Sequence, residues 1–241
     1  MDNASYVALA RQSALQRALD VTANNVANLR TTGFKAEKVQ FEEYMQALKS
    51  PGMKQAPLSS VLDVGTVTDM STGPLETTGN SLDFAILGDG FFAVQTDGGM
   101  RYTRGGSFRM DESGQLVTQD GKAVLDTGGS PIQLEGASGP VTVNGTGEIS
   151  SNGAILGQLG VVGFADPQSL VHEGNGLFKS DSVPTAAPVS IIQGMLESSN
   201  AQPIVEITRM IDILRNFESA QKMLDAQHDL SRDTVAKLGK V

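Results

Sequence analysis

Apolar residues at helical spacing occupy both ends of the chain. In residues 203–240 they recur at alternating three- and four-residue steps, which places them on one stripe of a helix. The stripe consists of Ile207, Met210, Leu214, Phe217, Leu224, Val235 and Leu238. Pro203 falls in the first turn, where its missing N–H does no harm, and residues 200–202 are expected to cap the helix. At about 1.5 Å per residue such a helix is about 50 Å long, so it needs a partner helix.

Residues 2–29 supply that partner. Their apolar and small side chains follow similar spacing and comprise Ala4, Ala8, Leu15, Leu19, Thr22, Val26 and Leu29. We therefore expect the N- and C-terminal amphipathic helices to pair as a coiled-coil-like inner domain, with the middle of the chain projecting outward.

Three asparagines stand near the end of the first helix. Asn24, Asn25 and Asn28 each cost about half a kcal/mol or more relative to alanine inside a helix, so they need compensation. In one interpretation they cap a frayed helix end. In the other, their amides bond to neighbouring helices at a packed interface, where an unpaired amide would be costly. The residues alone leave both open.

The pattern changes after this helix. Thr31, Thr32 and Gly33 are expected to stop it, because glycine takes the left-handed conformation of a helix end cheaply. Phe34 follows and begins an extended segment. Apolar positions between residues 41 and 48 predict a short second helix, broken by Ser-Pro-Gly at residues 50–52. Residues 51–81 contain several prolines and glycines and are interpreted as an extended connector.

From residue 82 onward, short apolar segments alternate with glycine-containing turns. Expected strands cover residues 82–87, 91–95, 101–104, 107–110, 115–118, 132–134, 141–143, 148–150, 156–162, 177–179 and 189–194. Strands about ten residues apart with Asp-Gly turns predict an all-β domain. The predicted fold class is α+β, with a helical inner domain from residues 1–50 and 195–241, a connector over residues 51–81 and a β outer domain over residues 82–194.

Charge and composition exclude several classes of function. The net charge is −9, and residues 56–200 carry five basic and sixteen acidic side chains, whereas both ends are close to neutral. This acidic middle repels phosphate backbones, so no nucleic-acid ligand is expected. The chain has no cysteine, which excludes disulfides and thiolate metal sites. It has neither an apolar run long enough to cross a bilayer nor a secretory signal pattern, so we expect no membrane insertion and no cleaved signal.

Candidate chemistry is weak. Gly88, Asp89 and Gly90 do not form a phosphate loop, because no Gly-Lys-Ser/Thr follows. Asp83 and Asp111 would be the carboxylate pair of a cell-wall hydrolase, yet such aspartates at strand ends and turns are favoured for local backbone bonding. A set of Asp225, His228 and Ser231 at helical spacing lacks an oxyanion site. We expect no enzyme activity, no cofactor and no metal.

Three segments carry a resemblance to a known family. They are ANNVAN at residues 23–28 with TTGFK at 31–35, LDFAI-GDGFF at 82–92 running on through YTR at 102–104 to Leu116 and Val117, and GMLESSN at 194–200. In this order they resemble the bacterial flagellar rod and hook proteins, and they span nearly the whole chain. The opening MDNASYV and QPIVE at residues 202–206 are most similar to proximal rod subunits, with a distal rod subunit as the alternative.

The resemblance implies a structural subunit that polymerises helically into the drive shaft and export channel of the flagellum. It implies export through the flagellar type III apparatus and a place in the periplasmic part of the basal body. Partners would be copies of itself and other proximal and distal rod proteins. The implied subunit interface consists of the helical stripes and the asparagine motif: Leu15, Leu19, Asn24, Asn25, Val26, Asn28, Gly33, Phe34, Asn200, Ile207, Met210, Leu214, Phe217, Leu224, Val235 and Leu238. A secreted adhesin or translocator is a further alternative.

Overall fold

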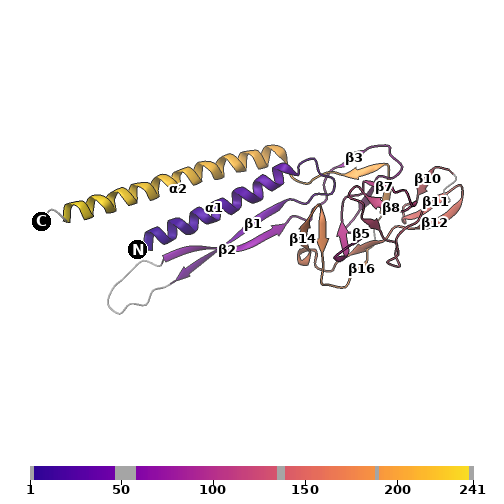
Figure 1. Ribbon diagram of the computed structural model, residues 1–241, viewed down its shortest axis with the longest axis horizontal. Coiled ribbons are helices and arrows are strands. Elements are labelled where there is room, and N and C mark those ends of the chain that lie inside the picture. The colour runs from indigo at the N-terminus through magenta and orange to yellow at the C-terminus, as the bar shows by residue number, and fades with distance from the viewer. Residues whose placement is uncertain (1–2, 47–57, 135–138, 188–189, 239–241) are drawn as a thin grey trace. The chain divides into compact units, whose positions relative to one another are not determined.

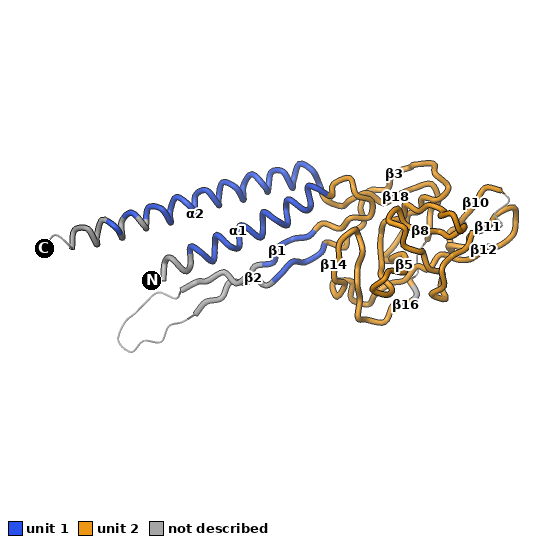
Figure 2. Tube along the Cα trace, in the orientation of Figure 1, with its two compact units in different colours: residues 1–27, 37–68, 202–241 blue, residues 28–36, 69–201 orange. Residues whose placement is uncertain are grey.

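The computed structural model describes residues 3–46, 58–134, 139–187 and 190–238 (Figure 1). Its contacts divide the chain into two compact units (Figure 2). Unit 1 comprises Met1–Ala27, Glu37–Thr68 and Gln202–Val241, and unit 2 comprises Asn28–Ala36 and Asp69–Ala201. Each unit therefore combines segments that are far apart in the sequence.

Unit 1 contains the two predicted terminal helices, α1 (Asn3–Ala27) and α2 (Pro203–Leu238), which pack against each other. Pro203 stands at the first position of α2, as expected. Ile213 and Ala220 of α2 and Ala14 of α1 are buried by this packing. The pairing of the helices within one unit agrees with the α+β fold class, and its coiled-coil character stays a prediction.

A β-hairpin completes unit 1. Strands β1 (Glu37–Gln46) and β2 (Leu58–Thr68) pair antiparallel, with a bulge between Gln40 and Phe41. The short helix expected over residues 41–48 is therefore wrong for its described part, while Leu48 and the break at residues 50–52 lie outside the described residues. Val39 and the aromatic residues of β1 suit a strand. The backbone groups of β1 bond to β2, which begins only at Leu58. The spacing of residues 41–48 alone could therefore not predict this pairing.

Unit 2 consists almost wholly of short antiparallel strands. They are β3 (Leu75–Thr77), β4 (Phe84–Leu87), β5 (Phe91–Thr96), β6 (Gly99–Thr103), β7 (Phe108–Met110), β8 (Leu116–Thr118), β9 (Ala123–Val124), β10 (Val141–Val143), β11 (Glu148–Ser151), β12 (Ala154–Gln158), β13 (Val161–Gly163), β14 (Val171–Gly174), β15 (Leu177–Lys179), β16 (Thr185–Ala186), β17 (Ser190–Gln193) and β18 (Met195–Glu197). A 3₁₀ turn, Pro167–Ser169, precedes β14. The all-β prediction for the middle of the chain is confirmed, although residues 132–134 contribute only an isolated bridge.

The largest sheet of unit 2 has the order β14-β15-β6-β5-β9-β8-β7, with β13 and β16 joined to it through β5. Strands β10, β11 and β12 form a second sheet, and β17-β4 and β18-β3 are separate pairs. One core cluster contains Phe84, Phe92, Phe108, Leu116 and Ile149 among its buried side chains. A second cluster packs around Phe91, Tyr102, Leu125 and Phe178.

The boundaries of the parts differ from those expected. Residues 195–197 form strand β18, which pairs with β3, so the C-terminal helix begins only at Pro203. Residues 51–81, expected to be a connector, contain β2 and β3 within their described part. Residues 28–36, expected to belong with the first helix, pack in unit 2. The first two shifts result from strand pairing between distant segments, and the third from contacts such as the bond from the Gly33 N–H to the Glu197 carbonyl.

Candidate functional site

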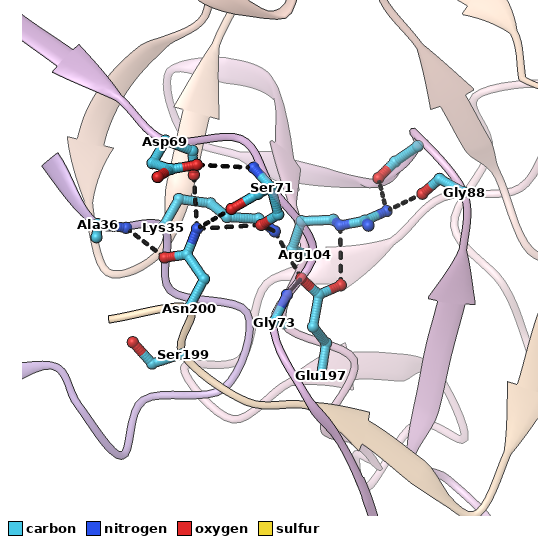
Figure 3. Close-up of polar contacts among 12 residues, drawn as sticks. Lys35, Ala36, Asp69, Ser71, Gly73, Gly88, Arg104, Glu197, Ser199 and Asn200 are labelled. Carbon is cyan, nitrogen blue, oxygen red and sulfur yellow. Dashed lines mark hydrogen bonds and ion pairs between the residues drawn. The ribbon is translucent and has the colours of Figure 1, made fainter. Parts of the chain in front are cut away.

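The three motif segments converge in unit 2 on a buried cluster of charges. Lys35 comes from the first segment, Arg104 from the second and Glu197 from the third (Figure 3). Their side chains are exposed by 1%, 3% and 1%. We refer to Lys35, Arg104 and Glu197 as the motif junction.

Glu197 is the centre of the motif junction. Its Oε1 accepts hydrogen bonds from Lys35 Nζ at 2.6 Å and from the Gly73 backbone N–H at 3.0 Å. Its Oε2 lies 3.1 Å from Arg104 Nε. The Glu197 carbonyl accepts a further bond from the Gly33 N–H at 2.7 Å. One residue of β18 thus binds three distant parts of the chain.

The two cations of the junction carry one more charge than Glu197 balances. Backbone carbonyls supply part of the remaining compensation: Lys35 Nζ donates to Ser71 O at 2.7 Å, and Arg104 Nη1 donates to Gly88 O at 2.9 Å and to Gly90 O. The carboxylates of Asp69 and Asp89 add to it, acting on Lys35 and Arg104 respectively. The guanidinium also lies 5.7 Å from the centroid of the Phe91 ring. Burial lowers the pKa of both Lys35 and Arg104 from their ordinary values, while Glu197 opposes that shift.

Backbone at the junction approaches too closely for side chains. Gly33 has φ +68°, as the sequence predicted, and a Cβ there would lie 2.3 Å from the Arg104 carbonyl carbon. A Cβ on Gly73 would lie 2.0 Å from Ser198 O. The helix itself ends earlier, at Ala27, so Gly33 serves the junction and not the end of α1.

Asn200 forms hydrogen bonds to three backbone groups near the motif junction. Its Oδ1 accepts from the Ala36 N–H at 2.7 Å, and its Nδ2 donates to Asp69 O at 2.7 Å and to Ser71 O at 3.0 Å (Figure 3). Of residues 200–202, which were expected to cap α2, Asn200 does not do so, because its amide bonds these backbone groups. Gln202 directly precedes α2, and its carbonyl accepts from the Glu206 N–H at 3.0 Å. Phe34 is buried, and its carbonyl accepts from the Asn200 N–H at 3.3 Å. Its ring lies edge-on to that of His172, with ring centroids 6.4 Å apart.

In unit 1, the side chain of Asn25 in the asparagine motif bonds to two other elements. Its side chain is buried, donates to Glu37 O at 2.8 Å and accepts from the Glu37 N–H at 3.0 Å. Its Nδ2 also lies 3.2 Å from Oε2 of Glu206 on α2. The packed-interface interpretation therefore holds for Asn25, inside one chain. Asn24 is exposed, and Asn28 accepts from the Thr31 hydroxyl at 3.1 Å.

The structure distributes the predicted helical stripes over two faces. Leu15, Leu19 and Val26 of α1 are half-buried, as are Met210, Phe217 and Leu224 of α2. Ile207 and Leu214 point to solvent, with 48% and 41% exposure. The side chains of Val235 and Leu238 lie outside the described residues.

An exposed apolar row on α2 was not recognised as a separate face by the sequence reasoning. Ile204, Ile207, Ile211 and Leu214 follow three- and four-residue steps and are exposed by 82%, 48%, 45% and 41%. We name this row the α2 stripe. The spacing of Ile204 and Ile211 carries this signal, whereas the predicted stripe contained only Ile207 and Leu214 of the row.

The two aspartates of the hydrolase alternative are engaged in local hydrogen bonds. Asp111 Oδ1 accepts from the N–H groups of Ser113 and Gln115 at 2.9 and 2.8 Å, and these bonds, the one from Gln115 foremost, lower the pKa of Asp111. A general acid would need the opposite shift. Asp83 accepts from the Asn80 amide at 3.2 Å. The side chains of His228 and Ser231 lie outside the described residues.

Among the residues that the structure describes, no group of three or more His, Cys, Asp or Glu side chains could hold a metal ion. No helix in the described part of the chain is long and apolar enough to cross a membrane.

Three family models match the chain in order. "Flagella basal body rod protein" matches residues 6–35, "Flagellar hook protein FlgE/F/G D1 domain" matches residues 85–151, and "Flagellar basal body rod FlgEFG protein C-terminal" matches residues 192–237. Each match contains or overlaps one of the three motif segments that meet around the motif junction.

Relatives extend this similarity to the full length. The flagellar basal-body rod protein FlgF of Caulobacter vibrioides is 44% identical over 100% of both chains. FlgF of Mesorhizobium japonicum is 37% identical over 99% of each chain. The rod protein FlgG of Bacillus subtilis is 32% identical over 95% of this chain and 97% of its own.

The chain therefore belongs to the family of flagellar basal-body rod proteins. The resemblance seen in the sequence is confirmed. Of the relatives named above, the two of higher identity are both FlgF proteins, so within the family the similarity is to FlgF.

Proposed function

We propose that this protein is a structural subunit of the flagellar basal-body rod, whose function is the contact it makes with neighbouring subunits. The family relationship over the full length supports this proposal.

The observation that carries the proposal is the α2 stripe. Four aliphatic side chains in a row on one helix face stay exposed after unit 1 has folded. Rows of this kind mark interaction surfaces, and each fully buried Ile or Leu contributes about 1.5–3 kcal/mol. Covering the stripe with a neighbouring subunit would therefore drive assembly.

A helical polymer follows if the contact joins different surfaces of like subunits. Contacts of that kind generate helices when the rotation does not close a ring. In our proposal the near-neutral terminal helices lie in the inner tube of the rod, and the acidic β part faces outward. The polymer would serve as drive shaft and export channel in the periplasm, with subunits delivered by the type III apparatus and bound to other rod proteins.

Within the rod we favour a proximal position. The similarity to FlgF proteins supports it, and the similarity to FlgG of Bacillus subtilis keeps a distal position as the second candidate. The hydrolase alternative has no support, because its carboxylates Asp83 and Asp111 are engaged in local hydrogen bonds.

A charge in the α2 stripe tests the proposal. Leu214→Asp should abolish swimming and rod assembly, while the purified chain keeps its thermal unfolding midpoint within a few degrees, because Leu214 is already 41% exposed. Asn216→Asp adds the same charge at an exposed polar position of α2 and is the matched control. Normal rods in the Leu214→Asp strain would refute the assembly role of the stripe.

A further inference from the structure

The last segment of unit 2 in the sequence lies beside its first strands. Residues 190–200 contain β17 and β18, and α2 begins soon after them at Pro203. β17 pairs with β4 and β18 pairs with β3, so the end of unit 2 is joined to the start of its β part. We call residues 190–200 the closing segment.

The bonds of the closing segment reach across long stretches of sequence. The side chains of Gln193, Glu197 and Asn200 form hydrogen bonds to residues that stand 50 to 164 positions earlier. The backbone reaches equally distant parts of the chain, since the Gly194 N–H donates to Asp83 O at 2.8 Å. Each of these bonds requires the closure of a long loop, which costs conformational entropy.

Several pairs in the largest sheet of unit 2, in contrast, join strands that follow one another in the sequence. β5 pairs with β6, β7 with β8, β8 with β9 and β14 with β15. These strands all lie between residues 91 and 179. Because short loops close at a lower entropic cost than long ones, these hairpins can form before the closing segment has docked.

The first part of unit 2 depends on the closing segment. Phe84 and Ile86 of β4 are each 1% exposed, and β17 is the strand to which β4 is paired. Without β17, backbone groups of this buried strand would lack their partners, which is costly. Lys35 and Arg104 likewise lack a carboxylate that contacts both of them until Glu197 has docked (Figure 3).

The closing segment also completes the apolar core. Ile191 is 5% exposed and belongs to the core cluster that contains Phe84, Phe92 and Phe108. A Cβ on Gly147 would lie 2.8 Å from Ile191 Cδ1, so the side chain fits closely against the turn before β11. An empty site at this position would remove packing contacts from the centre of the cluster.

We infer that the closing segment is the last part of unit 2 to form, and that unit 2 reaches its stable fold only when this segment has docked. A chain that emerges N-terminus first therefore keeps unit 2 open until residue 200 is available. Because α2 follows directly, closure of unit 2 marks a chain that is complete up to α2. The inference concerns the order of folding and stands apart from the proposed function.

Pulsed hydrogen exchange during refolding of the full-length chain tests this order. The purified chain is diluted out of urea, labelled after increasing times and analysed by mass spectrometry of its peptides. Peptides that cover β5 and β6 should become protected first. Peptides that cover β4, β17 and β18 should become protected together, with a rate constant lower by about tenfold or more. Protection of β17 and β18 at the same time as β5 and β6, or before them, would overturn the inference.

Ile191→Ala and Val94→Ala form a matched pair of variants, because both remove part of a buried aliphatic side chain from the same core cluster. Ile191→Ala should leave the protection rate of β5 and β6 within about twofold of that in the natural chain, even if β4 then stays unprotected. Val94→Ala, which lies in β5, should slow this early protection. An early phase that Ile191→Ala slows as much as Val94→Ala does would show that the closing segment takes part in it, contrary to the inference.

Discussion

At the scale of single residues, Glu197 shares one carboxylate between two cations that approach from different parts of the sequence. Lys35 is 162 positions away and Arg104 comes from the β5–β6 region, yet all three side chains are buried. A buried charge that loses its partner is costly, whereas an exposed pair contributes little. Removing one partner of the junction should therefore cost more than removing one partner of a surface ion pair.

Glu197→Gln should destabilise the chain by about 3–5 kcal/mol, because it removes the one carboxylate that contacts both buried cations, Lys35 and Arg104. The comparison is Glu173→Gln, which removes the partly exposed partner of Arg101 and should cost about 1 kcal/mol or less. Urea unfolding of the two purified variants measures both. Equal losses would mean that the junction is not an anchor.

A comparison of Gly33→Ala with Gly79→Ala separates the cost of a steric clash from the cost of a left-handed backbone conformation. Gly33 and Gly79 have similar φ values, +68° and +72°, but only Gly33 has backbone atoms in the space of a Cβ. Gly79→Ala should cost about 1–2 kcal/mol for the left-handed conformation alone. Gly33→Ala should cost clearly more, and a similar loss in both variants would show that the Arg104 backbone can move aside.

The sequence indicated part of this residue-scale picture. Gly33, Phe34 and Asn200 were singled out because they stand in recognisable motif segments, and each is engaged at the junction region. The ion pairs themselves could not be predicted, because no local spacing links Lys35 to Glu197. Only the folded sheet brings them together.

At the scale of elements, the spacing of the apolar residues predicted the terminal helices, but it did not predict which faces of these helices are buried. A single stripe was predicted on α2, and the structure instead turns Ile213 and Ala220 inward and leaves Ile207 and Leu214 exposed. The hairpin of β1 and β2 was missed, because its pairing joins residues that are up to 31 positions apart, Glu37 and Thr68. Helical period is a local property, whereas strand pairing is not.

Asn25 is the residue that joins three elements of unit 1. Its amide serves both backbone groups of Glu37 at the start of β1 and the carboxylate of Glu206 on α2. Asn25→Ala should therefore cost about 1–3 kcal/mol, the cost of leaving buried polar groups unsatisfied. The same change at exposed Asn24 should cost clearly less, since an exposed amide can exchange its partner for water. Thermal unfolding of both variants provides the comparison, and equal effects would contradict this role.

At the scale of the whole molecule, the sequence predicted the class correctly, because fold class depends on the period of long segments. Two helical ends around a β middle, with the acidic excess confined to residues 56–200, were visible from pattern and charge alone. The division into units was not, since residues 28–36 leave the helical part to pack with residues 69–201. That division depends on long-range pairs such as Gly33 with Glu197.

The central claim is that this chain is a structural part of the flagellar rod. Electron cryotomography of cell envelopes from a strain lacking the chain tests it most directly. Basal bodies with their membrane ring present and their rod truncated would agree with the claim, and the height of the truncation would distinguish a proximal from a distal position. Complete rods carrying rotating flagella in that strain would contradict it.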